Sequence, residues 1–155
     1  MAINVYVSYD KADQKHHDAY AALKKMSRQI LDTHDRGIKM PSADNAEQTV
    51  LCPFNDCQSK GIRDEILKKF EQCYKLVVLV GNDTFKDRWV EWEVNNFFRL
   101  KDALWPGKAW VRIRAMTLEG CDHAATPAAL ECRSTKRLTW DPDALEYWLE
   151  EETGG

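Results

Sequence analysis

Residues 74–81 have the sequence Tyr-Lys-Leu-Val-Val-Leu-Val-Gly, and this stretch decides the fold. Its apolar run does not alternate with polar residues, which indicates a strand that is buried on both faces. Burial on both faces is typical of a strand inside a parallel sheet, because crossover helices cover such a sheet from either side. We therefore predict an α/β fold in which residues 74–80 form an interior strand.

On either side of this run, the chain alternates between strand and helix patterns. Further strands are predicted at residues 3–9, 49–54, 109–115 and 136–140. Helices are predicted from residue 12 to about 35, and at residues 61–73, 87–104, 126–132 and 143–151. Five strands joined in this way favour a flavodoxin-like, three-layer fold with a parallel sheet of order 2-1-3-4-5. Repeats and linkers are absent from the sequence, so residues 1–155 are interpreted as one domain.

Composition narrows the range of functions. Hydrophobic residues make up 44% of the chain and charged residues 30%, as in a globular domain. The net charge of −3 argues against a general nucleic-acid binder. No apolar run approaches the roughly 20 residues that cross a bilayer, and the first residues lack a secretory pattern, so we expect a cytoplasmic protein without a membrane partner. Five irregularly spaced cysteines predict free thiols, with neither a disulfide framework nor a metal site.

The predicted fold also gives an expected position for a ligand. In doubly wound sheets, ligands bind beyond the carboxyl ends of the strands, where the strand order reverses. The candidate binding residues are therefore those that follow the first three predicted strands: Ser8, Tyr9, Asp10, Phe54, Asn55, Asp56, Asn82, Asp83 and Thr84. For the last three of these residues, ordinary turn chemistry after a strand is an equally good interpretation.

A candidate catalytic residue lies on the helix predicted at residues 87–104. Glu93 shares a stripe of this helix with Trp89 and Phe97, at spacings of four residues, whereas Glu91 belongs to the polar face. A carboxylate that lies on an aromatic stripe near a helix N-terminus and faces a cleft is a candidate functional group. From the spacing alone, a solvated glutamate at the rim of the apolar face is the favoured interpretation.

Four separated segments, in the right order, resemble a known family. Residues 5–9, Val-Tyr-Val-Ser-Tyr, are similar to the first-strand pattern V-F-I-S-Y of Toll/interleukin-1 receptor (TIR) domains. Residues 61–66, Gly-Ile-Arg-Asp-Glu-Ile, and residues 76–81, Leu-Val-Val-Leu-Val-Gly, look like those of TIR-like proteins in the bacterial Thoeris anti-phage defence system. Residues 89–93 match the family pattern W-C-x-x-E, with Val90 in place of cysteine. The resemblance extends from residue 3 to about residue 115.

The resemblance implies an activity. It implies an enzyme that cleaves NAD as a substrate, holds no permanent cofactor, and uses Glu93 as the catalytic carboxylate. Trp89 or Phe54 would stack on a ring of NAD, and residues 82–84 would line the pocket. The product would be ADP-ribose or a cyclic isomer that activates a separate effector protein. Active sites in this family are commonly completed by self-association, so the resemblance implies that a second copy of the chain is a partner.

One residue departs from the family, and two other functions stay open. Several NAD-cleaving TIR domains have a basic residue at the position of Asp10, which matters for how NAD is held. A non-enzymatic TIR-like interaction module would have the same fold. A response-regulator receiver also shares the architecture, but Asp83 is only roughly placed for phosphorylation, and no lysine follows the fifth predicted strand.

Overall fold

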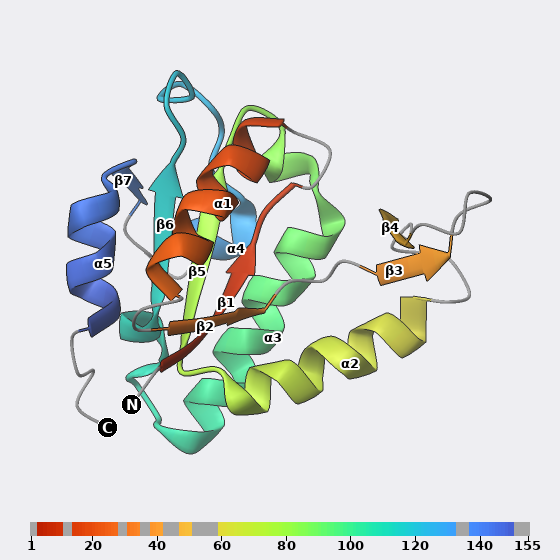
Figure 1. Ribbon diagram of the computed structural model, residues 1–155. Helices are drawn as coiled ribbons and strands as arrows, with labels where there is room; N and C mark the ends of the chain where they lie inside the picture. The colour runs from red at the N-terminus through yellow and green to blue at the C-terminus, as the bar shows by residue number, and fades with distance from the viewer. Residues whose placement is uncertain are drawn as a thin grey trace.

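The computed structural model describes residues 3–10, 14–27, 31–34, 38–41, 47–50, 59–132 and 137–150. Its main sheet has the order β2-β1-β5-β6-β7, and every neighbouring pair of strands is parallel (Figure 1). The strands are β1 (Ile3–Ser8), β2 (Leu31–His34), β5 (Lys75–Val80), β6 (Ile113–Thr117) and β7 (Arg137–Thr139). The predicted α/β class with a parallel sheet is confirmed.

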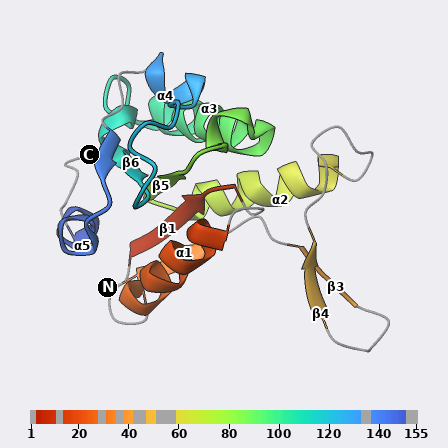
Figure 2. The ribbon, with the colours of Figure 1, turned by 90° about the horizontal axis from the view of Figure 1, so that it is seen from above.

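Helices cover the sheet on both sides. Figure 2 shows α2, α3 and α4 on one side of the sheet and α1 and α5 on the other. The helices are α1 (Gln14–Ser27), α2 (Ser59–Gln72), α3 (Arg88–Leu104), α4 (Ala128–Glu131) and α5 (Pro142–Glu150), with two short 3-10 helices, η1 (Thr84–Lys86) and η2 (Ala109–Arg112). None of the helices in the described ranges is long and apolar enough to cross a membrane.

Strand β5 is buried along its whole length, as its sequence predicts. Leu76, Val78 and Val80 pack in the apolar cluster beneath α2 and α3. Val77 and Leu79 point the other way, into the cluster beneath α1 and α5. Successive side chains of a strand alternate between faces, so this one strand contributes to both cores.

The prediction for the second strand is wrong. The strand that pairs with β1 is β2, in a part of the sequence where a helix was expected. The predicted segment was residues 49–54, of which residues 49 and 50 belong to β4 (Glu47–Val50), which pairs antiparallel with β3 (Ile38–Pro41) in a separate sheet. Residues 51–54 lie outside the described residues. Within the described part of the chain, strand β2 lies at the sheet edge beside β1, and its Leu-Asp-Thr-His sequence lacks the apolar run that identifies an interior strand.

The fourth predicted strand begins and ends later than expected. After α3 the chain turns at Gly107, whose φ of 77° is a left-handed conformation that glycine adopts readily. Residues 109–112 then form η2, in which Trp110 is 51% exposed, so the first four residues of the predicted strand do not belong to the sheet. Strand β6 ends at Thr117, which places residues 118–120 at the carboxyl edge of the sheet.

Two buried lysines bind the last carbonyl groups of helices. The ammonium group of Lys75 donates to the carbonyls of Trp148 and Leu149 near the end of α5. That of Lys101, on α3, donates to the carbonyl of Phe70 near the end of α2 at 2.8 Å. Helix ends leave carbonyls without intrahelical partners and carry a partial negative charge, so a cation is stabilising there. Burial lowers the pKa of Lys101 below its ordinary value of 10.5.

Candidate functional site

Helix α3 presents Glu93 to the interior of the protein. The side chain of Asp87 caps the helix by accepting from the backbone N–H groups of Trp89, at 2.8 Å, and Val90, at 3.3 Å. The buried stripe of α3 follows a helical spacing and consists of Trp89, Val90, Glu93, Val94, Phe97 and Lys101. Glu93 lies in the middle of this stripe and is 0% exposed. The interpretation of Glu93 as a solvated residue at the rim is therefore wrong. Glu91 is half-buried on another side of the helix.

Two hydroxyl groups from β1 donate to the Glu93 carboxylate. The Tyr6 hydroxyl donates to Oε2, and the Ser8 hydroxyl donates to Oε1 at 2.8 Å. Both residues are themselves buried. They are two positions apart on one strand, so their side chains leave the sheet on the same face. These hydrogen bonds offset part of the cost of taking a carboxylate out of water, which is large when the group has no partner.

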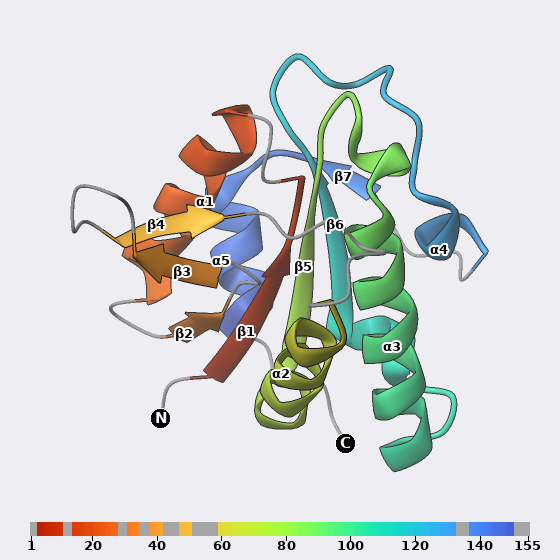
Figure 3. The ribbon, with the colours of Figure 1, turned by 90° about the vertical axis from the view of Figure 1, so that its right-hand side faces the viewer.

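Aromatic packing fixes the position of the Tyr6 hydroxyl. The Tyr6 ring meets the Phe70 ring of α2 edge to face, with centroids 4.9 Å apart. Phe70 in turn meets Phe97 of α3 in the same way, at 5.4 Å. Because Lys101 binds the Phe70 carbonyl, helices α2 and α3 are joined at the residue that supports Tyr6. Figure 3 shows these two helices beside β1, β5 and β6, whose carboxyl ends share one edge.

The structure does not bring all of the predicted residues near Glu93. Tyr9 follows Ser8 and points to the opposite face of the sheet, where its ring stacks on Tyr20 of α1 at a centroid distance of 5.3 Å. Asp10 is half-buried just beyond the end of β1. Phe54, Asn55 and Asp56 lie outside the described residues. Ser8, the last residue of β1, does lie beside Glu93 and donates a hydrogen bond to it.

The loop after β5 carries three of the predicted residues in two different environments. Asn82 and Asp83 are exposed, and the Asp83 carboxylate lies 3.7 Å from the ammonium group of Lys86. Thr84 is buried, and its hydroxyl accepts from the Gly81 N–H at 2.8 Å, within the same loop. This contact is the turn chemistry that the sequence allows for. It helps to set the path by which the chain leaves β5 and enters α3.

Trp89, the remaining predicted residue, lies in the first turn of α3. It is 7% exposed, and its ring packs edge to face against Trp92 at a centroid distance of 6.2 Å. It therefore belongs mainly to the apolar cluster beneath α2 and α3.

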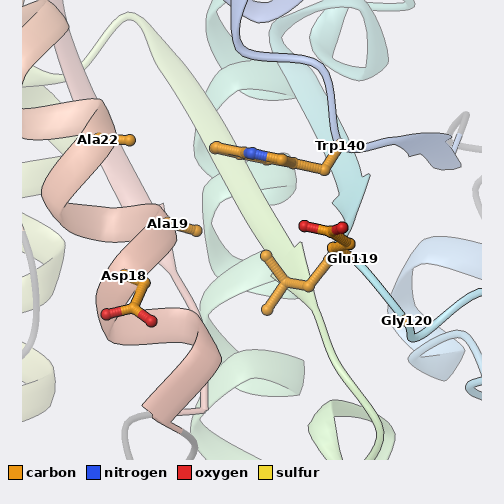
Figure 4. A pocket seen from close by; sticks show the side chains of 7 residues that line it. Asp18, Ala19, Ala22, Glu119, Gly120 and Trp140 are labelled. Carbon is orange, nitrogen blue, oxygen red and sulfur yellow. The ribbon is translucent and has the colours of Figure 1, made fainter.

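A pocket lies on the other face of the sheet, where no predicted site residue lines it. It has a volume of about 440 Å³ and is bounded by Asp18, Ala19, Ala22, Leu118, Glu119, Gly120 and Trp140. Figure 4 shows the Trp140 indole extending toward α1, with the carboxylates of Asp18 and Glu119 on different walls. Sequence reasoning missed this pocket because it considered only the loops after the first three strands. Residues 118–120 and Trp140 follow the last two strands, and inspection of those two strand ends would have indicated the pocket.

In the described ranges, no group of three or more His, Cys, Asp or Glu side chains is arranged to bind a metal ion. Cys73, Cys121 and Cys132 are free thiols, and the first two are buried.

Comparison with known proteins gives one family. No curated protein matches the chain. A family model described as Thoeris protein ThsB, TIR-like domain, matches residues 6–115. The matched region begins at Tyr6, includes Ser8 and Glu93, and covers more than two thirds of the sequence. The chain therefore belongs to the family of TIR-like domains of the Thoeris protein ThsB.

Proposed function

We propose that this protein is an NAD-cleaving enzyme with Glu93 as its catalytic carboxylate. Membership of the Thoeris family supports a role in anti-phage defence and gives the receiver interpretation no support. The observation that carries the proposal is the hydrogen bond of Glu93 to Ser8, the last residue of β1. It links the glutamate of the W-x-x-x-E pattern to the strand end at which doubly wound sheets bind ligands.

The chemistry of NAD cleavage suits one carboxylate. The bond between nicotinamide and ribose breaks through a transition state that resembles an oxocarbenium ion, as in glycoside cleavage. Nicotinamide is cationic while it is attached and leaves as a neutral molecule, so its departure needs no general acid. An anion near the ribose stabilises the positive charge that develops there. Glu93 would supply this anion and would accept hydrogen bonds from the ribose hydroxyls.

The identity of the acceptor decides the product. Attack by water gives ADP-ribose, and attack by a group of the same molecule gives a cyclic isomer. We propose that the product signals to a separate effector protein, that cleavage depends on self-association, and that the reaction takes place in the cytoplasm. We further propose the flavodoxin-like fold of TIR domains for the whole chain, since the sheet has the order β2-β1-β5-β6-β7.

One observation favours a second function, a non-enzymatic interaction module. Glu93 is 0% exposed in the described structure, so a ligand does not reach it without a rearrangement. A module that acts only through its surface would use this glutamate as a buried structural group.

One experiment separates the two functions. Purified protein is incubated with NAD over a range of protein concentrations, and the products are analysed by mass spectrometry. Release of nicotinamide with ADP-ribose or a cyclic isomer supports the enzyme. Complete recovery of NAD at every concentration, also with a crowding agent, supports the interaction module.

A further inference from the structure

The two hydroxyl groups that bind Glu93 lie at different depths in the protein. Ser8 is the last residue of β1, at the carboxyl edge of the sheet. Tyr6 is two residues earlier, which places its backbone roughly 6.6 Å further from that edge. The Glu93 carboxylate therefore has one oxygen bound to an edge residue and the other bound to an interior residue.

The proposed function requires the Glu93 carboxylate to move. In the described structure none of its surface is exposed, so it cannot contact a ribose. A short displacement toward the edge would keep the hydrogen bond to Ser8 and break the one to Tyr6. The lost hydrogen bond would be replaced by one from a ribose hydroxyl of the bound substrate. Because only a ligand with such hydroxyls makes this replacement, the exchange would also select the ligand.

We propose that Tyr6 is a positioning residue that holds Glu93 in an inward, inactive state, and that release from the Tyr6 hydroxyl is a step in the activation of the site. This inference rests on the proposed function. Phenylalanine has the same ring as tyrosine without the hydroxyl, and it stands at the position of Tyr6 in the first-strand pattern V-F-I-S-Y that residues 5–9 resemble. The Tyr6→Phe variant therefore removes the hydroxyl and keeps the ring that packs on Phe70.

Carbodiimide labelling measures the exposure of Glu93 without any enzymatic activity. The protein is treated with a carbodiimide and an amine, digested with trypsin, and analysed by mass spectrometry. Cleavage after Arg88 and Arg99 gives one peptide, residues 89–99, that contains both Glu91 and Glu93. Glu91 is thus an internal control in the same peptide.

We expect the labelling rate of Glu93 to rise about tenfold in Tyr6→Phe, the scale of one hydrogen bond to a charged group, while that of Glu91 is unchanged. An unchanged Glu93 rate in folded Tyr6→Phe overturns the proposal. If this variant does not fold, the five tyrosines of the parent protein are replaced by 3-fluorotyrosine, whose phenol is a stronger donor. The Glu93 rate should then fall, and a constant or higher rate contradicts the inward state.

Turnover of NAD separates positioning from a merely structural role. Tyr6→Phe should raise kcat, because the released state becomes more populated, whereas Ser8→Ala should lower it, because Ser8 orients the released carboxylate. A structural role for Tyr6 predicts lower or unchanged kcat in both variants, so a kcat in Tyr6→Phe that is unchanged or lower also overturns the proposal. If the parent and both variants leave NAD intact, the proposed function fails, and the labelling rates still decide whether Tyr6 holds Glu93.

Discussion

The Ser8 hydroxyl donates to Oε1 of Glu93 at 2.8 Å across 85 residues of sequence. This bond joins the carboxyl end of β1 to the second turn of α3. It places an ionisable group of the helix next to the strand end where the predicted fold would bind a ligand. Glu91, two residues earlier on the same helix, is half-buried on another side of α3.

Glu93→Gln should lower NAD turnover by roughly 100-fold or more, the scale of losing one electrostatic stabiliser. The amide keeps the size of the side chain but removes the charge that would stabilise the oxocarbenium ion. Glu91→Gln is the matched control. Two positions on a helix are about 200° apart, so Glu91 faces away from the site, and its variant should turn over NAD as the parent does. Loss of turnover in Glu91→Gln with normal turnover in Glu93→Gln would show that the wrong glutamate has been chosen.

Burial changes what is expected for the stability of Glu93 variants. As a residue at the rim, Glu93 would contribute little to folding. Since it is 0% exposed and accepts from Tyr6 and Ser8, Glu93→Ala should lower the free energy of unfolding by about 3 kcal/mol, because two buried hydroxyls lose an acceptor and a cavity forms. Glu91→Ala should change it by less than about 0.5 kcal/mol. Urea unfolding followed by circular dichroism measures both, and equal effects would argue against a buried carboxylate.

The position of NAD can be tested against the pocket on the opposite face. We expect chemical-shift changes on addition of NAD or ADP-ribose at Ser8, Asn82 and the Trp89 indole, because these residues follow or adjoin the ends of β1 and β5. The Trp140 indole and Glu119, which line the other pocket, should not shift. Changes confined to Trp140 and Glu119 would move the ligand to the face covered by α1 and α5.

Activity should depend on self-association. Glu93 is 0% exposed in the described structure, and contact with a second copy of the chain would supply the energy that opens or completes the site. Specific activity should therefore rise with protein concentration and with an added crowding agent. Light scattering on the same samples reports the oligomeric state. Constant specific activity in a protein that stays monomeric throughout would count against this dependence.

The sequence predicts the interior strand β5 and the edge strand β7 close to their observed bounds, but it misses the edge strand β2. Residues 76–80 are apolar without interruption, and burial on both faces follows from that pattern alone. Among the described strands, Leu31–His34 pairs with β1 alone and needs no such run, and its short polar sequence reads as a continuation of the preceding helical pattern. A local apolar pattern identifies a strand that buries all of its side chains, as β5 does. It does not identify a strand such as β2, whose conformation depends on pairing with a distant strand.

The same distinction applies to the candidate site. The helical spacing correctly places Glu93 on one stripe with Trp89 and Phe97. Its depth does not follow from the helix pattern alone, because burial of a carboxylate depends on hydroxyl donors, and Tyr6 is 87 residues away in sequence. A search for hydroxyl residues at alternate positions of the strand beside α3 would have found Tyr6 and Ser8 together.

Lys101 gives a prediction for the pH dependence of stability. Burial lowers its pKa in the folded protein below 10.5, so between the folded pKa and 10.5 the unfolded chain binds more protons. The contribution of Lys101 to stability should therefore be fully present above pH 10.5 and be lost as the pH falls through the folded pKa.

The measurement is the difference in unfolding free energy between the parent and Lys101→Met at increasing pH. The variant also leaves the Phe70 carbonyl without the ammonium donor of Lys101. Lys108→Met, which removes an exposed charge, is the control. A difference for Lys101→Met that falls with rising pH, or that follows the control, would contradict a lysine whose charge is disfavoured by burial.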